Sequence, residues 1–100
     1  MPHVYILECA DGSYYVGSTR NIDARLYQHQ QGMGAEYTKR RLPVRLAWAG
    51  ETETVAEAYA LEKKLQGWSR AKREAVIRGD WHLLPGLSRN RQSDPDADRG

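Results

Sequence analysis

Two short runs of strand-forming residues flank an Asp-Gly pair near the start of the chain, and this hairpin signal constrains the fold more than any other feature. Residues 4–8 and 14–18 are rich in β-branched and aromatic side chains, and Asp11-Gly12 lies between them. An Asp-Gly pair in that setting is typical of antiparallel strands joined by a tight turn. The sequence therefore predicts a hairpin built from these two runs.

Helical and strand patterns alternate in the rest of the chain. Residues 21–31 are predicted to form a helix that stops at Gly32, a residue type that suits a helix C-terminus. A polar loop then leads to a third strand at residues 44–50. Thr54 and Glu57 have the spacing of a capping box, which predicts a helix from that point to residue 66.

A last helix is expected between Ser69, its N-cap, and Gly79. These elements predict an α+β fold, in which a small three-stranded antiparallel sheet is flanked by helices. A chain of 100 residues supports one modest core, so we expect one domain over residues 1–87. Residues 88–100 hold no large apolar side chain, and we expect them to form a disordered polar tail.

Cysteine usage and hydropathy bear on the compartment. The lone Cys9 cannot form an internal disulfide, and no Cys or His cluster offers a zinc site. No stretch reaches the apolar length of a membrane span, and Met1-Pro2 leads directly into the first strand without a charged, apolar leader. We therefore expect a cytoplasmic protein with no membrane association.

Basic residues are unevenly distributed, although the net charge is only +2. One group lies near residue 40 and another in the helical C-terminal third. Two such patches suit a phosphate backbone, but solvated helix faces explain them equally well, and both interpretations stay open. The candidate nucleic-acid-binding residues are Lys39, Arg40, Arg41, Lys63, Arg70 and Lys72.

Glu62 is an exception on an otherwise apolar helix face. Helical spacing places it on the arc that is formed by Val55, Ala58, Tyr59, Leu61 and Leu65. A buried carboxylate without a partner costs several kcal/mol. Two explanations remain open: a buried salt bridge to Arg25, or a metal ligand at the edge of a cleft.

Arg25 and His29 lie one turn apart on the first predicted helix, and His29 falls at the border of its buried stripe. A lone histidine there is more often packed than catalytic, and Arg25 alone is an ordinary surface charge. The two residues occur, however, in a chain that also has a carboxylate on a buried face and a pair of spaced tyrosines. We therefore treat the combination as a candidate catalytic set.

An ordered series of short motifs resembles the GIY-YIG nuclease family, whose name records two tyrosine tripeptides on a hairpin. The resemblance covers about two thirds of the chain. Its motifs are Val4-Tyr5-Ile6-Leu7 and Tyr15-Val16-Gly17-Ser18-Thr19, followed by Asn21, Arg25, Leu26, His29, Gly32, Ala35, Tyr37, Thr38 and Glu62.

The resemblance implies a role for five of these residues. Glu62 corresponds to the family's single metal-binding carboxylate, which suits Mg²⁺ or Mn²⁺. Arg25 corresponds to an arginine that contacts the phosphate, and Tyr5 and Tyr15 correspond to the paired tyrosines. Either Tyr15 or His29 is the general base, and we favour His29 because the pKa of an imidazole lies nearer neutrality than that of a phenol.

By this resemblance the chain is expected to be a metal-dependent endonuclease that acts on DNA with low sequence specificity, with DNA repair or processing as its setting. RNA is not excluded, and the oligomeric state is open. The chain is most similar to the small stand-alone bacterial branch, and it departs from other members by having Ser18 and Glu74 where some carry lysine and asparagine. The alternatives are a nucleic-acid-binding module without efficient catalysis and a protein-interaction domain.

The same resemblance makes a prediction about the hairpin turn. The family's site needs Tyr5 and Tyr15 on one face of the sheet, and each one-residue change of register moves a side chain to the opposite face. A two-residue turn at Asp11-Gly12 would separate the two rings. We therefore expect a three-residue loop, Ala10-Asp11-Gly12, in which Gly12 has a positive φ.

Overall fold

The structure, a computed structural model, describes residues 1–80. It divides into two compact units, of which the first, Met1–Trp68, holds the sheet and the candidate site, and the second begins at Ser69. The expected tail at residues 88–100 lies outside the described residues, and the single domain over residues 1–87 stays a prediction. In residues 1–80, no helix is long and apolar enough to cross a membrane.

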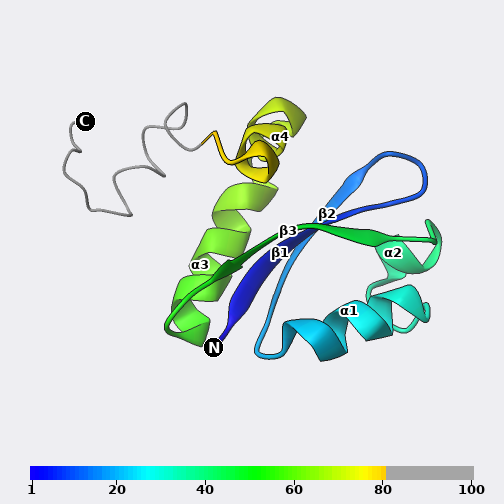
Figure 1. Cartoon of the computed structure of the whole chain (residues 1–100), viewed down its shortest axis with the longest axis horizontal. Coiled ribbons are helices and arrows are strands. Elements are labelled where there is room, and N and C mark those ends of the chain that lie inside the picture. Colours follow the sequence, from blue (N-terminus) through cyan, green and yellow to red (C-terminus); the bar gives the residue numbers. More distant parts are fainter. Residues whose placement is uncertain (81–100) are drawn as a thin grey trace. The chain divides into compact units, whose positions relative to one another are not determined.

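Three antiparallel strands form the sheet of the first unit (Figure 1). They are β1 (His3–Glu8), β2 (Tyr14–Thr19) and β3 (Arg45–Glu51), in the order β2-β1-β3. The central strand β1 pairs with both neighbours and is buried on both faces from Val4 to Leu7. The predicted α+β fold with a three-stranded antiparallel sheet is confirmed.

The hairpin between β1 and β2 has the predicted three-residue loop. The backbone N–H of Cys9 donates to the carbonyl of Ser13 at 2.9 Å, and Gly12 between them has a φ of 85°. Leu7 consequently pairs with Tyr15 across the hairpin. Since Tyr5 and Leu7 share a face of β1, Tyr5 and Tyr15 lie on the same face of the sheet, as predicted.

Each face of the sheet is covered by a different helix of the first unit (Figure 1). On the face of Tyr5, helix α1 (Ile22–Gln30) packs Ile22 and Leu26 against a buried cluster that includes Leu7. The opposite face carries the buried side chains of Val4, Ile6 and Val16, and helix α3 (Val55–Gln66) lies against β1 and β2. The sheet is therefore the middle layer of the unit.

The helices begin and end close to the predicted positions. Asn21 caps α1, and its side chain accepts a hydrogen bond from the backbone of Ala24. The capping box of Thr54 and Glu57 at the start of α3 is present with both of its hydrogen bonds. In the second unit, α4 (Arg70–Arg78) is capped by Ser69 and ends at Gly79, which has the left-handed conformation.

Two expectations about local structure are wrong. The polar loop after Gly32 contains a short helix, α2 (Glu36–Lys39). It has no apolar period to reveal it, because its one buried side chain is the polar Thr38. On α3, Val55 and Tyr59 are 46% and 56% exposed, although both lie on the expected apolar arc. The sheet covers a narrower stripe of α3, in which Ala58 and Leu65 are buried.

Candidate active site

A chain of three hydrogen bonds, two of them buried, connects β1, α1 and α2. The Tyr5 hydroxyl lies 2.9 Å from Nε2 of His29, and Nδ1 of His29 lies 2.8 Å from the hydroxyl of Thr38. The Thr38 hydroxyl donates in turn to the carbonyl of Ala35, at 3.0 Å. His29 is 1% exposed and Thr38 is fully buried. His29 thus lies inside the core rather than at its border.

The last bond in this chain determines the tautomer of His29. A carbonyl can only accept a hydrogen bond, so the Thr38 hydroxyl donates its one hydrogen to Ala35. It can then only accept a hydrogen bond from His29. Nδ1 therefore carries the hydrogen, and Nε2 has a lone pair that accepts from the Tyr5 hydroxyl. Tyr5 is left with a base that is already aligned with its proton.

Burial shifts the pKa values of all three aromatic groups. Burial, and then the neighbouring Tyr15, raise the pKa of Tyr5 to about 12, although the charge of Arg25 opposes this. The pKa of Tyr15 is also raised, by burial and then by the charge of Glu62. The pKa of His29 is lowered by burial and then by Arg25, so His29 is neutral at pH 7.

A column of rings and one guanidinium holds Tyr15. The rings of Tyr15 and Tyr37 are stacked with their centroids 6.0 Å apart, and Arg41 lies 3.8 Å over the other ring, that of Tyr37. Arg41 also donates to the backbone carbonyl of Tyr37 and pairs with Asp11 in the hairpin loop. These contacts connect Tyr15 with the hairpin loop through Tyr37 and Arg41.

Glu62 projects from α3 as a half-buried carboxylate. One of its oxygens accepts a 2.5 Å hydrogen bond from the Ser18 hydroxyl, and the other accepts from the Gln66 amide at 2.9 Å. Its negative charge raises the pKa values of both Tyr5 and Tyr15, so it lies within electrostatic reach of both hydroxyls. The rings of Tyr5 and Tyr15 lie 6.5 Å apart between centroids, and Glu62 acts on both of them electrostatically.

The alternative explanation of Glu62 as half of a salt bridge is wrong. Within residues 1–80, neither Glu62 nor Arg25 belongs to any ion pair. Two neutral donors orient the carboxylate instead of a cation. An ionised carboxylate offers about four lone-pair positions, so two remain for a metal ion. This donor set fits an ion such as Mg²⁺, which keeps most of its waters.

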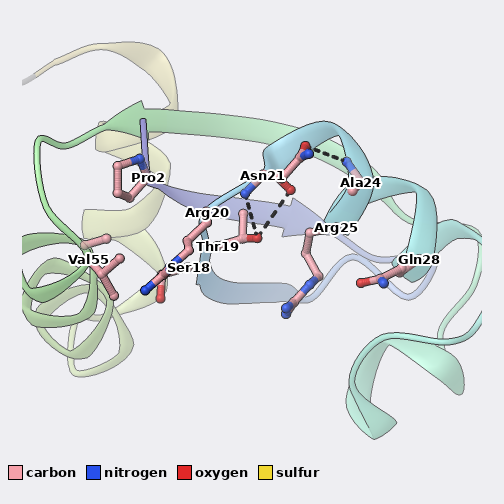
Figure 2. Close-up of a pocket in the computed structure, with 10 residues that line it drawn as sticks. Pro2, Ser18, Thr19, Arg20, Asn21, Ala24, Arg25, Gln28 and Val55 are labelled. Carbon is pink, nitrogen blue, oxygen red and sulfur yellow. Dashed lines mark hydrogen bonds between the residues drawn. The ribbon is translucent and has the colours of Figure 1, made fainter.

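Arg25 lines an open cleft of about 410 Å³ (Figure 2). Its charge acts on Tyr5, and its side chain also lines the cleft, together with Ser18, Arg20 and Gln28. The guanidinium is only partly buried. It can therefore reach an anion that is placed between the tyrosines and this cleft.

The six basic candidates have different surroundings. Lys63 lies 4.8 Å from the ring of Tyr59, and its charge lowers the pKa of Tyr15, which places it near the site. Arg40 pairs with Glu36 on the surface, and Lys39 is exposed. The charge of Arg41 is already engaged in the column described above. Arg70, which pairs with Glu74, and the exposed Lys72 belong to the second unit.

Two glycines give the catalytic candidates their room. A Cβ atom on Gly17 would lie 2.5 Å from the Tyr5 hydroxyl, and one on Gly34 would overlap Nδ1 of His29. Cβ atoms in proteins essentially never approach non-bonded heavy atoms more closely than 3.0 Å. The absence of a side chain at Gly17 therefore leaves room for the Tyr5 hydroxyl, and its absence at Gly34 leaves room for the imidazole of His29.

The sequence patterns assigned no role in the site to four supporting residues. Gln66 could have been found, because it lies one helical turn after Glu62. Ser18 belongs to a matched motif and also departs from some members, and neither fact indicates that its hydroxyl bonds Glu62. Thr38 and Tyr37 reach the site from α2, which the polar loop concealed. No spacing rule connects a residue of one helix with a residue of another helix nine positions later, as His29 and Thr38 are connected.

Comparison with known proteins agrees with this geometry. A family model described as the GIY-YIG catalytic domain matches residues 1–75, and the chain belongs to the GIY-YIG family. This is a nuclease family whose members act on nucleic acid and generally depend on a divalent metal ion. The GIY-YIG endonuclease-like fold expected from the motifs is thereby confirmed.

Its relatives are small proteins that the chain matches over nearly their whole length. The chain is 41% identical over 77 residues to a UPF0213 protein of the archaeon Halobacterium salinarum. The match covers 77% of this chain and 100% of the relative. It is 40% identical over 75 residues to a UPF0213 protein of Staphylococcus aureus, and the match covers 75% of this chain and 92% of the relative. The resemblance to a stand-alone branch is confirmed, and that branch includes archaea as well as bacteria.

Two solved structures have the same fold. One is the solution NMR structure of a UPF0213 protein from Bacillus halodurans, with a TM-score of 0.51, 40% identity and coverage of 78% of this chain and 84% of that one. The other is the solution NMR structure of a protein from E. faecalis, with a TM-score of 0.54 and 37% identity. The match covers 81% of this chain and 85% of that one.

Proposed function

We propose that this protein is an Mg²⁺- or Mn²⁺-dependent endonuclease that hydrolyses phosphodiester bonds in DNA with low sequence specificity. One observation carries the proposal: Glu62 is a half-exposed carboxylate that neutral donors hold within electrostatic reach of two tyrosine hydroxyls. A structural carboxylate would be expected to have a cation as partner. An oriented carboxylate without a paired cation is instead suited to hold a metal ion next to a substrate phosphate.

Glu62 would be the protein's ligand to the ion, oriented by Ser18 and Gln66. When bound, a divalent ion supplies neutralisation of the charge that develops on the phosphoryl oxygens. Arg25 would stabilise the same charge from the cleft side, because its planar guanidinium can donate two hydrogen bonds to a phosphate. Neither role reads a base, and low sequence specificity follows.

Tyr5 and His29 would together accept the proton of the attacking water. The water gives its proton to the Tyr5 oxygen while the Tyr5 proton passes to Nε2 of His29, along the existing 2.9 Å hydrogen bond. The resulting imidazolium keeps Nδ1–H bonded to Thr38. The hydroxide forms the new bond to phosphorus, the bond to the leaving oxygen breaks, and that oxygen takes a proton from solvent. His29 thus acts as the base through Tyr5, without contacting the water.

The Glu62→Gln substitution tests the metal site, with Glu53→Gln as the matched control. Both changes remove one negative charge, and Glu53 is exposed ahead of α3. Glu62→Gln should abolish metal-dependent nicking of plasmid DNA, retain or improve DNA binding because a negative charge near the phosphate is lost, and leave the melting temperature within a few degrees of wild type. Glu53→Gln should nick at the wild-type rate.

Two outcomes would contradict the proposal. If Glu62→Gln costs roughly 3 to 5 kcal/mol of stability, the carboxylate has a structural role. If nicking by this variant persists at the wild-type rate, the metal is not held by Glu62. Salt-sensitive DNA binding without any nicking by the wild-type protein would indicate a binding module instead.

A further inference from the structure

The cleft beside Arg25 has an uneven lining that suits part of a nucleotide. It is formed where β2 ends, where α1 begins and where α3 begins (Figure 2). The charged residues in its lining are Arg20 and Arg25, and the lining contains no carboxylate. Pro2, Val55 and Ala58 supply an apolar wall. A ligand that matches this surface is anionic and carries an apolar group.

The two cleft arginines also differ from the other arginines of the first unit. Arg40, Arg41 and Arg45 are each paired with a carboxylate. In contrast, Arg20 and Arg25 belong to none of the ion pairs found in residues 1–80. Two cations in one cleft without a counter-ion create a positive potential, which the surrounding protein concentrates.

The cleft is continuous with the candidate active site. Ser18 lines it and also donates to Glu62, and Arg25 lines it while its charge acts on Tyr5. Gln28 lies one turn after Arg25, and Figure 2 shows both side chains on the same side of α1. A strand whose phosphate lies at Tyr5 and Glu62 would therefore enter this cleft with its next nucleotide.

We propose that the cleft binds the backbone phosphate next to the scissile one. Arg20 holds this second phosphate, and the deoxyribose lies against Val55. Arg20 is therefore a binding residue, and it positions the strand so that the neighbouring phosphate meets Arg25 and Glu62. The inference rests on the proposed function for its ligand, a nucleic-acid strand, and adds a second phosphate site to it.

Arg20→Gln tests this assignment, with Arg45→Gln as the matched control. Both variants lose one positive charge, and Arg45 is an exposed residue of β3 outside the cleft. Binding of a labelled single-stranded oligodeoxynucleotide is measured in EDTA, where no cleavage intervenes, from 50 to 300 mM salt. We expect Arg20→Gln to weaken binding about tenfold and to reduce the salt slope by about 0.7, while Arg45→Gln changes affinity less than twofold.

Nicking supplies the second measurement. With metal present, Arg20→Gln should raise KM about tenfold and lower kcat far less, because the contact is formed in the ground state as well. Gln28→Glu places a negative charge in the cleft and should weaken binding at least as much. Melting curves of both variants should match wild type, because Arg20 and Gln28 are exposed.

The two proposals fail in different ways. If Arg20→Gln and Gln28→Glu both bind the oligonucleotide as Arg45→Gln does, the cleft is not a phosphate site, even if the wild-type protein nicks DNA. If binding falls as expected but the wild-type protein never nicks, the cleft assignment stands and hydrolysis is refuted. A fall in kcat with unchanged KM and unchanged affinity would also overturn the cleft assignment.

Discussion

The hydroxyl of Tyr5 and Nε2 of His29 are joined by a buried hydrogen bond of 2.9 Å. The two side chains are equally buried, at 1% exposure each. In the proposed mechanism Tyr5 and His29 act as one unit, in which the tyrosine passes the proton and the histidine stores it.

Removing the Tyr5 hydroxyl should separate chemistry from binding. Tyr5→Phe deletes the group that passes the proton and leaves Nε2 of His29 without a donor. We expect kcat for plasmid nicking to fall by about 10² to 10⁴, and stability to fall by about 1 to 3 kcal/mol. Oligonucleotide affinity should stay within about twofold of wild type. Nicking by Tyr5→Phe at the wild-type rate would refute the relay.

The activity should have an acid limb that is set by His29. Because burial and Arg25 lower the pKa of His29, the neutral form that accepts the Tyr5 proton persists below the ordinary value of about 6.5. Nicking should therefore be constant above that pH and decline only below it. If Tyr15 were the base, its raised pKa would make the rate climb through alkaline pH instead. A pH–rate profile of kcat decides between them.

Stability should follow the same titration. A histidine with a lowered pKa in the folded state favours folding fully above its unfolded pKa, near 6.5, and that contribution is lost as the pH falls toward the folded value. The melting temperature should thus decrease between pH 7 and pH 5. His29→Gln should have a lower melting temperature at pH 7 but a smaller decrease. Equal pH dependence in both proteins would show that His29 contributes no linkage.

Ser18 should control metal affinity without being a ligand. Its hydroxyl orients one oxygen of Glu62, and loss of such a partner typically weakens a metal site 10- to 100-fold. We expect Ser18→Ala to need about that much more Mg²⁺ for half-maximal nicking and to approach the wild-type rate at saturating metal. An unchanged Mg²⁺ requirement would mean that Gln66 alone orients the carboxylate.

Neighbouring arginines should have very different effects on stability. Arg41 stacks on Tyr37 and donates to its backbone carbonyl, so Arg41→Ala should cost about 1 to 2 kcal/mol and lower the melting temperature by several degrees. Arg40→Ala breaks only a pair whose side chains are 73% and 69% exposed, and the expected change is below about 0.5 kcal/mol. Similar melting temperatures for the two variants would show that the contacts of Arg41 with Tyr37 do not stabilise the fold.

The hairpin and the helix caps could be predicted from the sequence because their causes are local. Asp11-Gly12 determines a turn within a few residues, and Thr54 with Glu57 determines a helix start. The α2 helix could not be predicted in this way. It depends on Thr38, whose partner His29 comes from another helix, and such a contact leaves no periodicity in the sequence.

The site residues were reached by a combination of both kinds of information. Glu62 was noticeable as a charge on an apolar arc, but its partners decide what it does, and Ser18 lies 44 positions away in the chain. The apolar arc itself was overestimated, because helical spacing predicts which side chains share a face and does not predict how wide the covering sheet is. Val55 and Tyr59 are the residues for which this difference matters.

Tyr15 is supported from the side by Tyr37, and Tyr37 is held by an arginine that is anchored on Asp11 at the tip of the hairpin. The Tyr15 ring is therefore not held by β2 alone. Under the proposed function, a substitution in the exposed turn at Asp11 would act on the active site through Arg41 and Tyr37.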